Sequence, residues 1–224
     1  MQFRTLIGSL AGVVVLAACA APASAQHQGH GAEQGGSLHH ALADGWHARL
    51  DRPAAAGPEF TTMPPGWHVT SGPSGILYHP ERTASGTYRV DSKIHLFDPG
   101  ERREAFGIFI GGQDLDGDGQ RYTYFLLRRD GRYLIKTRNG AETGVLSDWT
   151  EHAAVRSWES RAEGDATVEN DLAIDVGTDE VAFLVNGQEV ARLPRAQVDT
   201  DGVVGLRVNH GLNLHVASLE VTTN

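Results

Sequence analysis

Three aspartates stand at alternate positions in a short segment near the middle of the chain, Asp114-Leu-Asp116-Gly-Asp118-Gly119. Carboxylates at positions 1, 3 and 5 of a loop, followed by glycine at position 6, are the pattern with which calcium loops surround the ion with oxygen atoms. Position 12, where such a loop has a bidentate glutamate, is occupied by Phe125. The same residues also suit a plain acidic turn between two strands. Calcium binding is therefore one of two interpretations of this segment.

A second run, Tyr122-Thr-Tyr124-Phe-Leu-Leu-Arg128, has the pattern of a central strand. Successive side chains of a strand point to opposite faces, so Tyr122, Tyr124 and Arg128 share one face. Phe125 and Leu127 share the other face. If that other face enters the core, the two aromatic rings and the guanidinium line the opposite surface, where they could bind a sugar. Packing of the tyrosines under a neighbouring loop is the alternative.

Three further residues complete the candidate ligand-binding set. Trp149 has an indole ring of the kind that covers the apolar face of a pyranose. Asn209 and His210 lie beside a glycine turn near the end of the chain and offer hydrogen-bonding groups. The alternatives to ligand contact are core packing of the tryptophan and a turn in which the histidine has its hydrogen bonds satisfied.

Catalytic residues cannot be assigned from the sequence. Hydrolysis of a glycoside requires two carboxyl groups that face one bond, and Glu169, Asp171 and Asp175 share the face of one predicted strand. Acids that alternate with buried apolar residues are, however, the usual water-facing side of a strand. The sequence contains no Gly-x-Ser-x-Gly nucleophile elbow, no His-Glu-x-x-His zinc motif, no phosphate loop and no dinucleotide fingerprint.

These residues would be positioned by a succession of short β-patterned runs separated by turns rich in Gly, Pro, Asp and Asn. Leu172, Ile174 and Val176 alternate with polar residues, which predicts a strand with one buried face. Turns such as Asn139-Gly140 supply the positive φ angles that tight hairpins need. Short strands at this spacing predict an all-β sandwich or barrel. The expected strands are 67–70, 75–79, 87–97, 105–111, 121–128, 133–137, 171–176, 181–185, 203–208 and 214–221, with a small helical turn around 150–158.

Several stretches together resemble concanavalin A-like lectin/glucanase domains. They include Phe106-Gly-Ile-Phe-Ile-Gly-Gly, Asp130-Gly-Arg-Tyr-Leu-Ile-Lys, Val185-Asn-Gly and Val204-Gly-Leu-Arg-Val. The nearest family is the bacterial domain family labelled 3-keto-disaccharide hydrolase, and the likeness covers about residues 66–221. The resemblance implies a jelly-roll sandwich of two antiparallel sheets, with a concave face where sugars bind in lectin-like relatives. Such folds include both binding proteins and enzymes.

The N-terminal part has the features of a targeting segment. An apolar run behind Arg4 has the length of a secretory h-region, so residues 1–25 are expected to be a signal peptide. Residues 16–19 resemble a lipobox ending at Cys19, the only cysteine and the candidate lipidation site, whereas 23–25 suit an ordinary signal peptidase. Residues 26–44, rich in His, Gly and Gln, are expected to be a flexible linker, and 45–224 the folded domain.

The chain is acidic, with a formal net charge of −9. A protein that binds nucleic acid needs basic patches to displace counterions from phosphate, so nucleic acid is not an expected partner. Basic residues do gather between positions 128 and 138, but acids or apolar residues are interleaved with them, so we interpret them as solvated strand faces. This group consists of Arg128, Arg129, Arg132, Lys136 and Arg138.

Three functional hypotheses remain open. The first is an exported carbohydrate-binding domain of the cell envelope, in the periplasm, on the outer membrane as a lipoprotein, or secreted. The second, implied by the resemblance, is a glycoside hydrolase or lyase acting on 3-keto sugars, with Asp116, Asp148 or His210 as the base. The third is a structural envelope protein that binds another protein. Carbohydrate is the expected partner in the first two.

Overall fold

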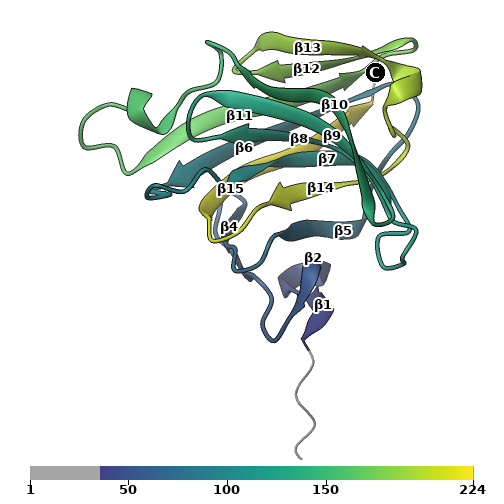
Figure 1. Cartoon of the computed structure of the whole chain (residues 1–224), viewed down its shortest axis with the longest axis horizontal. Coiled ribbons are helices and arrows are strands. Elements are labelled where there is room, and N and C mark those ends of the chain that lie inside the picture. The colour runs from purple at the N-terminus through teal and green to yellow at the C-terminus, as the bar shows by residue number, and fades with distance from the viewer. Residues whose placement is uncertain (1–35, 224) are drawn as a thin grey trace, which may run out of the picture. The chain divides into compact units, whose positions relative to one another are not determined.

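The computed structural model describes residues 36–223, which form two antiparallel sheets (Figure 1). The eight-stranded sheet contains, in spatial order, β1 (Ser37–Ala41), β2 (His47–Ala54), β5 (Gly75–Ala84), β14 (Gly202–Val208), β7 (Ala105–Gln113), β8 (Arg121–Arg128), β9 (Arg132–Asn139) and β10 (Glu142–Glu151). The seven-stranded sheet contains β13 (Gln188–Pro194), β12 (Glu180–Val185), β11 (Thr167–Val176), β6 (Tyr88–Phe97), β15 (Asn213–Thr223), β4 (Trp67–Thr70) and β3 (Glu59–Thr62). The predicted jelly-roll sandwich is therefore confirmed.

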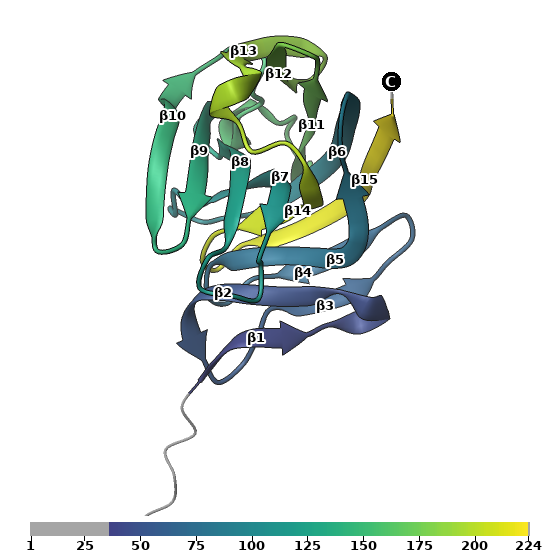
Figure 2. The ribbon, with the colours of Figure 1, turned by 90° about the vertical axis from the view of Figure 1, so that its right-hand side faces the viewer.

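The two sheets are stacked as layers, and the eight-stranded sheet is curved. Figure 2, a view turned by 90°, shows that its outer face is concave, because β10 at one edge and β1 and β2 at the other bend away from the seven-stranded sheet. Short 3-10 turns connect some strands, namely η1 (Ala43–Gly45), η2 (Trp158–Ser160) and η3 (Arg195–Gln197). Within the described residues, no helix has the length and apolar character needed to cross a membrane.

Each strand expected from the sequence is present, and β4 and β8 have the predicted bounds. Strands β1, β2, β3, β10 and β13 were not predicted. Most side chains of β10 are exposed, so its sequence lacks the alternation of a strand with one buried face. The expected helical turn around 150–158 is replaced by the end of β10 and the later turn η2.

The N-terminal boundary of the folded domain corrects the sequence prediction. Residues 26–44 were expected to be a flexible linker, but β1 lies within that range and pairs with β2, where His39 is opposite Arg49 and Ala41 is opposite His47. A strand at the edge of a sheet is held by backbone hydrogen bonds and needs few apolar residues. The expected signal peptide at 1–25, the candidate lipidation site Cys19 and the part of the expected linker up to residue 35 lie outside the described residues.

The side chains between the two sheets follow the predicted alternation. Leu172, Ile174 and Val176 of β11 are buried there, as are Phe125 and Leu127 of β8. A second apolar cluster covers the concave face of the eight-stranded sheet. Its buried members are Ile76, Tyr78, Ala105, Phe109, Leu115, Tyr122, Tyr124, Leu126 and Leu134, with Trp149 and Val203 packed against them.

Candidate functional site

The concave face is the outer face of the eight-stranded sheet, and it gathers most of the chemistry predicted from the sequence. Directly paired residues of neighbouring strands point to the same face, so the register defines its members. Tyr124 is opposite Phe109 on one side and Lys136 on the other, and Tyr122 is opposite Arg138. Towards the N-terminal edge the face continues with Arg207, Ile76, Tyr78, Arg49 and His47.

Tyr122 and Tyr124 form an aromatic floor on this face. As predicted, the two tyrosines lie on the opposite face of β8 from Phe125 and Leu127. Their side chains are only 2% and 7% exposed, so they do not form an open surface on which a sugar ring could stack. The ring centroid of Tyr122 lies 5.1 Å from that of Phe109 and 5.7 Å from that of Tyr124. Burial raises the pKa of both phenols, which therefore stay protonated and able to donate at neutral pH.

An ion pair between Arg207 of β14 and Asp51 of β2 lies beside this floor. Two guanidinium nitrogens of Arg207 donate to the two Asp51 carboxylate oxygens at 2.7 and 2.5 Å. The guanidinium also lies 5.7 Å from the ring centroid of Tyr124. Burial, the largest single effect, opposes the charge of Arg207, but the hydrogen bonds and charge of Asp51 together with Tyr122 and Tyr124 outweigh it, and the pKa of Arg207 is raised. The arginine is therefore a fixed cation whose charge Asp51 balances.

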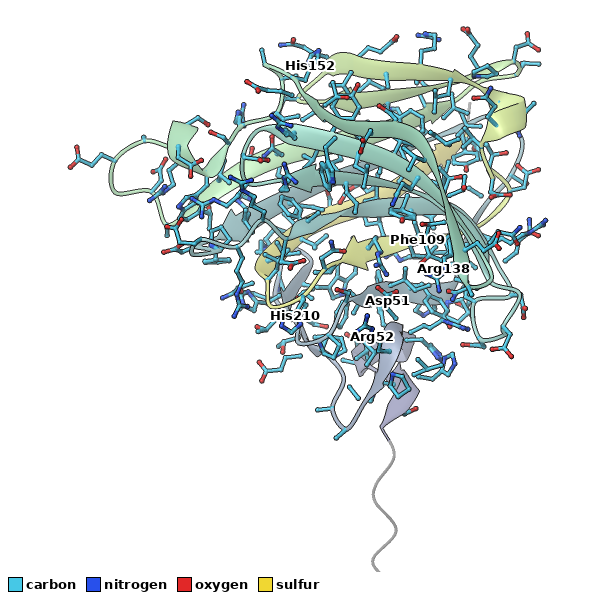
Figure 3. The ribbon with its side chains drawn as sticks, in the orientation of Figure 1. Asp51, Arg52, Phe109, Arg138, His152 and His210 are labelled. Atoms are coloured by element: carbon cyan, nitrogen blue, oxygen red, sulfur yellow. The ribbon has the colours of Figure 1, made fainter. Side chains whose placement is uncertain are left out.

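Lys136 and Arg138 bring two further cations to the face, where Arg138 is opposite Tyr122; Figure 3 labels Arg138 together with Phe109 and Asp51. Both side chains are half-buried. The Arg138 Nε donates to the carbonyl of Gly140 at 2.6 Å. Among the described residues, no carboxylate lies within ion-pair distance of Lys136 or Arg138. The charges of these two residues are therefore not balanced by a neighbouring acid, although both side chains lie partly exposed on the outer face of the sheet.

Arg128 and Trp149 meet at the β10 side of the concave face. The Arg128 guanidinium lies 4.4 Å from the centroid of the Trp149 ring and donates to both carboxylate oxygens of Asp130, at 2.8 and 2.7 Å. Partial burial acts to raise the pKa of Asp130, but the hydrogen bonds from Arg128 lower it overall. Trp149 is half-buried. The structure thus brings these two predicted residues together, with the charge of Arg128 already balanced.

The loop that carries the three aspartates is held by Arg49 of β2, on the side of the concave face away from β10. The buried guanidinium of Arg49 donates to the carbonyls of Leu115 and Gly117 at 2.8 and 2.6 Å. Leu115 packs into the apolar cluster. The carboxylate of Asp114 accepts from the backbone N–H of Gly119 at 3.0 Å, which closes the turn. These contacts show how the loop is held without an ion.

The calcium interpretation finds no support in the arrangement of the aspartates. Asp116 accepts from the Tyr78 hydroxyl at 2.5 Å and lies 3.5 Å from His39. Asp114, Asp116 and Asp118 are all exposed, and the structure does not bring them together. In the described part of the chain, no group of three or more His, Cys, Asp or Glu side chains could hold a metal ion. In this structure the segment is a turn that Asp114 closes and Arg49 holds against the sheet.

Asn209 and His210 lie at the end of the concave face that carries Asp51. The backbone of Asn209 makes two hydrogen bonds. Its N–H donates to the carbonyl oxygen of Ala105 at 2.8 Å, and its own carbonyl oxygen accepts from the Ser71 hydroxyl at 2.6 Å. His210 is exposed and lines a cavity of about 340 Å³ together with Asp51. The other residues of that cavity are Arg52, Pro73 and Ser74. Figure 3 shows the labelled side chains of this end.

Comparison with solved structures identifies the architecture. The chain aligns with a carbohydrate-binding module of family 66 from Bacillus subtilis at a TM-score of 0.57 and 12% identity, over 80% of this chain and 96% of that one. The fold is a galectin-like jelly roll. A protein of unknown function from Bacillus subtilis, described as having a galectin-like fold, aligns at a TM-score of 0.55 and 10% identity, over 80% and 89% of the two chains.

Part of a longer protein also shares this architecture. The Bacteroides ovatus protein named xyloglucan PUL GH43B aligns at a TM-score of 0.51 and 13% identity, over 84% of this chain and 39% of that one. No family model matches the sequence, and the comparison with curated proteins found no match. The jelly-roll fold that the resemblance implied is confirmed, whereas membership of the 3-keto-disaccharide hydrolase family is not confirmed.

The sequence did not reveal the ion pair that organises the site. Asp51 and Arg207 are 156 positions apart, and neither belongs to a recognisable motif. The one available signal was Arg207 itself, a charged residue inside the apolar run Val204-Gly-Leu-Arg-Val. A buried arginine needs a partner, but only the strand order shows that this partner comes from β2.

Proposed function

We propose that this protein is a carbohydrate-binding domain and that its ligand lies on the concave face. The observation that carries the proposal is an apolar concave face on which the ring of Trp149 is half-buried and which also presents the hydrogen-bond donors Lys136, Arg138 and Arg207. Sugars need both kinds of contact, because their rings have apolar faces and their hydroxyls need polar partners. The shared fold with a carbohydrate-binding module supports the proposal.

We further propose that the domain acts outside the cytoplasm. The apolar run behind Arg4 and the position of Cys19 support export, followed by lipid attachment at the outer membrane or release into the periplasm or medium. An envelope location would place the domain where polysaccharides are found.

The proposal is tested by measuring binding of the full chain to a panel of polysaccharides, by affinity electrophoresis and by the shift in melting temperature. Trp149→Ala removes a half-buried ring from the concave face, and Phe97→Ala, a half-buried aromatic on the outer face of the other sheet, is the matched control. We expect Trp149→Ala to weaken binding and Phe97→Ala to leave it unchanged. Absence of binding to every glycan would instead favour a structural or protein-binding role.

Glycoside cleavage is a second candidate function, favoured by one cavity. A cavity of about 480 Å³ is lined by two carboxylic acids, Asp44 and Glu81, together with His79, Trp46, Trp67 and Arg82. Two carboxyl groups beside aromatic rings are what acid/base cleavage of a sugar requires. The three residues that the sequence suggested as bases do not line this cavity. Asp116 accepts a hydrogen bond from Tyr78, and His210 lines a different cavity. The third, Asp148, caps the N–H of Trp149.

The enzymatic alternative is tested by turnover of a 3-keto-disaccharide. If the cavity is catalytic, Glu81→Gln abolishes turnover while Glu180→Gln, the same change at an exposed site on β12, does not. Absence of turnover by the unaltered protein on 3-keto and ordinary glycosides would exclude this alternative for those substrates.

A further inference from the structure

The cations of the concave face differ in how their charges are balanced. Arg207 is paired with Asp51, and Arg128 is paired with Asp130. Arg49 donates to the two carbonyls of the aspartate loop. Lys136 and Arg138, in contrast, have no carboxylate within ion-pair distance among the described residues.

On the outer face of the other sheet, two cations do have acidic partners. There, Lys93 lies 2.7 Å from Glu169 and 2.8 Å from Asp171. Arg89 lies 2.9 Å from Asp91 and 3.8 Å from Asp175. Single half-buried arginines without an acidic partner occur elsewhere in the described part of the chain, as at Arg82 and Arg161. Lys136 and Arg138 differ from them because the two cations are neighbours on one strand face, in a chain whose net charge is −9.

The positions of Lys136 and Arg138 suit recognition of negative charge. They are two residues apart on β9, so their Cα atoms are about 7 Å apart and both side chains point to the concave face. Arg138 is opposite Tyr122 and Lys136 is opposite Tyr124. The floor beneath them is apolar and buried, which weakens the screening of their charge by water.

We infer that the ligand of the concave face is an anionic glycan whose carboxylate or sulfate groups bind Lys136 and Arg138. This inference rests on the proposed carbohydrate binding and adds the class of sugar. The guanidinium of Arg138 can donate two parallel hydrogen bonds to a carboxylate or a sulfate, and the ammonium of Lys136 attracts either as a point charge. The ring of Trp149, which is half-buried on the same face, offers an apolar surface for the sugar ring.

The inference is tested by titrating the full chain with three polymers: polygalacturonate, which carries carboxylates, dextran sulfate, which carries sulfates, and neutral dextran. The double variant Lys136→Gln/Arg138→Gln removes both charges. Arg192→Gln is the control, because Arg192 is an exposed residue of β13 in the other sheet. Each titration is made at low and at high salt.

We expect an anionic polymer to bind the unaltered chain, dextran to bind much more weakly, and the double variant to lose roughly tenfold or more in affinity for the anion. High salt should weaken binding of the unaltered chain but have less effect on the double variant. Arg192→Gln should change little. Comparison of polygalacturonate with dextran sulfate shows which acidic group is preferred.

Two outcomes would overturn the inference in distinguishable ways. If dextran or another neutral glycan binds as tightly as the anions, and the double variant binds as the unaltered chain does, carbohydrate binding stands and the anionic class is wrong. If no glycan binds at all, the proposed function and this inference both fail. A melting temperature of the double variant close to that of the unaltered chain confirms that lost affinity is not lost folding.

Discussion

Arg207 and Asp51 join β14 to β2 across the intervening strand β5, through hydrogen bonds of 2.7 and 2.5 Å. Arg207 is almost wholly buried, with a side chain that is 11% exposed, whereas Asp51 is 32% exposed. Because the same guanidinium lies over Tyr124, the ion pair connects the N-terminal strands to the floor of the proposed ligand site.

Loss of the Asp51 charge is expected to destabilise the fold. Asp51→Asn leaves the buried Arg207 without its counterion, and we predict a loss of about 2–4 kcal/mol in the free energy of unfolding. This predicted loss of stability is smaller than the loss expected for a fully buried ion pair, because solvent reaches part of the Asp51 side chain. Urea unfolding followed by fluorescence measures the effect.

An exposed ion pair supplies the control for that prediction. Glu189→Gln removes one of the two acidic partners of Arg192 on β13, where both side chains are more than 40% exposed, and should cost much less stability than Asp51→Asn. Equal losses for Asp51→Asn and Glu189→Gln would contradict the structural role assigned to Arg207.

Gly205 is predicted to be intolerant of any side chain. A Cβ at this position of β14 would lie 2.5 Å from the backbone oxygen of Leu77 and 2.5 Å from a ring carbon of Phe109. We therefore expect Gly205→Ala to cost about 2 kcal/mol or more and to displace Phe109 from the aromatic floor. Gly72→Ala is the comparison, since a Cβ there would meet nothing within 4 Å. A melting temperature unchanged by Gly205→Ala would refute this packing.

A row of histidines on the outer face of the seven-stranded sheet should make stability depend on pH. His215 is opposite both His68 and His95, and its ring lies 5.8 Å from that of His95. Burial, reinforced by the charges of His95 and His68, lowers the pKa of His215. Below a pH of about 6.5 the unfolded chain therefore binds a proton that the folded chain does not, so stability falls as the pH falls until the folded pKa is passed.

Thermal melts between pH 5 and pH 8, a range around the ordinary histidine pKa of about 6.5, test this dependence. His215→Gln should make stability less sensitive to pH in this range, because it removes the group whose proton uptake differs between the two states. His210→Gln, a change at an exposed histidine, should not. The explanation is wrong if the unaltered chain and His215→Gln lose stability in parallel.

Calcium is expected to have no effect on the fold. The aspartate loop is closed by Asp114 and fastened by Arg49, and its three carboxylates do not converge. Addition of calcium or of a chelator should therefore leave the melting temperature unchanged. A calcium-dependent rise that Asp118→Asn removes would restore the calcium interpretation.

The parts of the fold that were predictable from sequence are those in which one strand face is buried. In β8 the alternation of Tyr124 with Phe125 follows from the pleat alone, and the two residues lie on opposite faces as expected. In β1 and β10 the side chains are polar or exposed and the strands lie at the edges of the sheet. Backbone pairing holds such strands, and it leaves no pattern in the sequence.

The candidate site was only partly predictable for a different physical reason. The sequence indicated Tyr122, Tyr124 and Arg128 because they share one strand, but it could not show that other strands would bury the tyrosines. Likewise, a lysine such as Lys136 looks solvated in sequence whether or not an acid lies opposite. Which charges are balanced depends on the order of strands, which is a property of the whole fold.

The most direct test of the account is to map the bound glycan on the protein by amide chemical shifts in NMR, with an oligogalacturonate titrated into the full chain. We predict that the residues whose amide shifts change lie on β8, β9, β10 and β14, with Lys136, Arg138 and Trp149 among them. Perturbations confined to Lys93, His95 and their neighbours on the other sheet, or to the cavity beside Trp67, would contradict it.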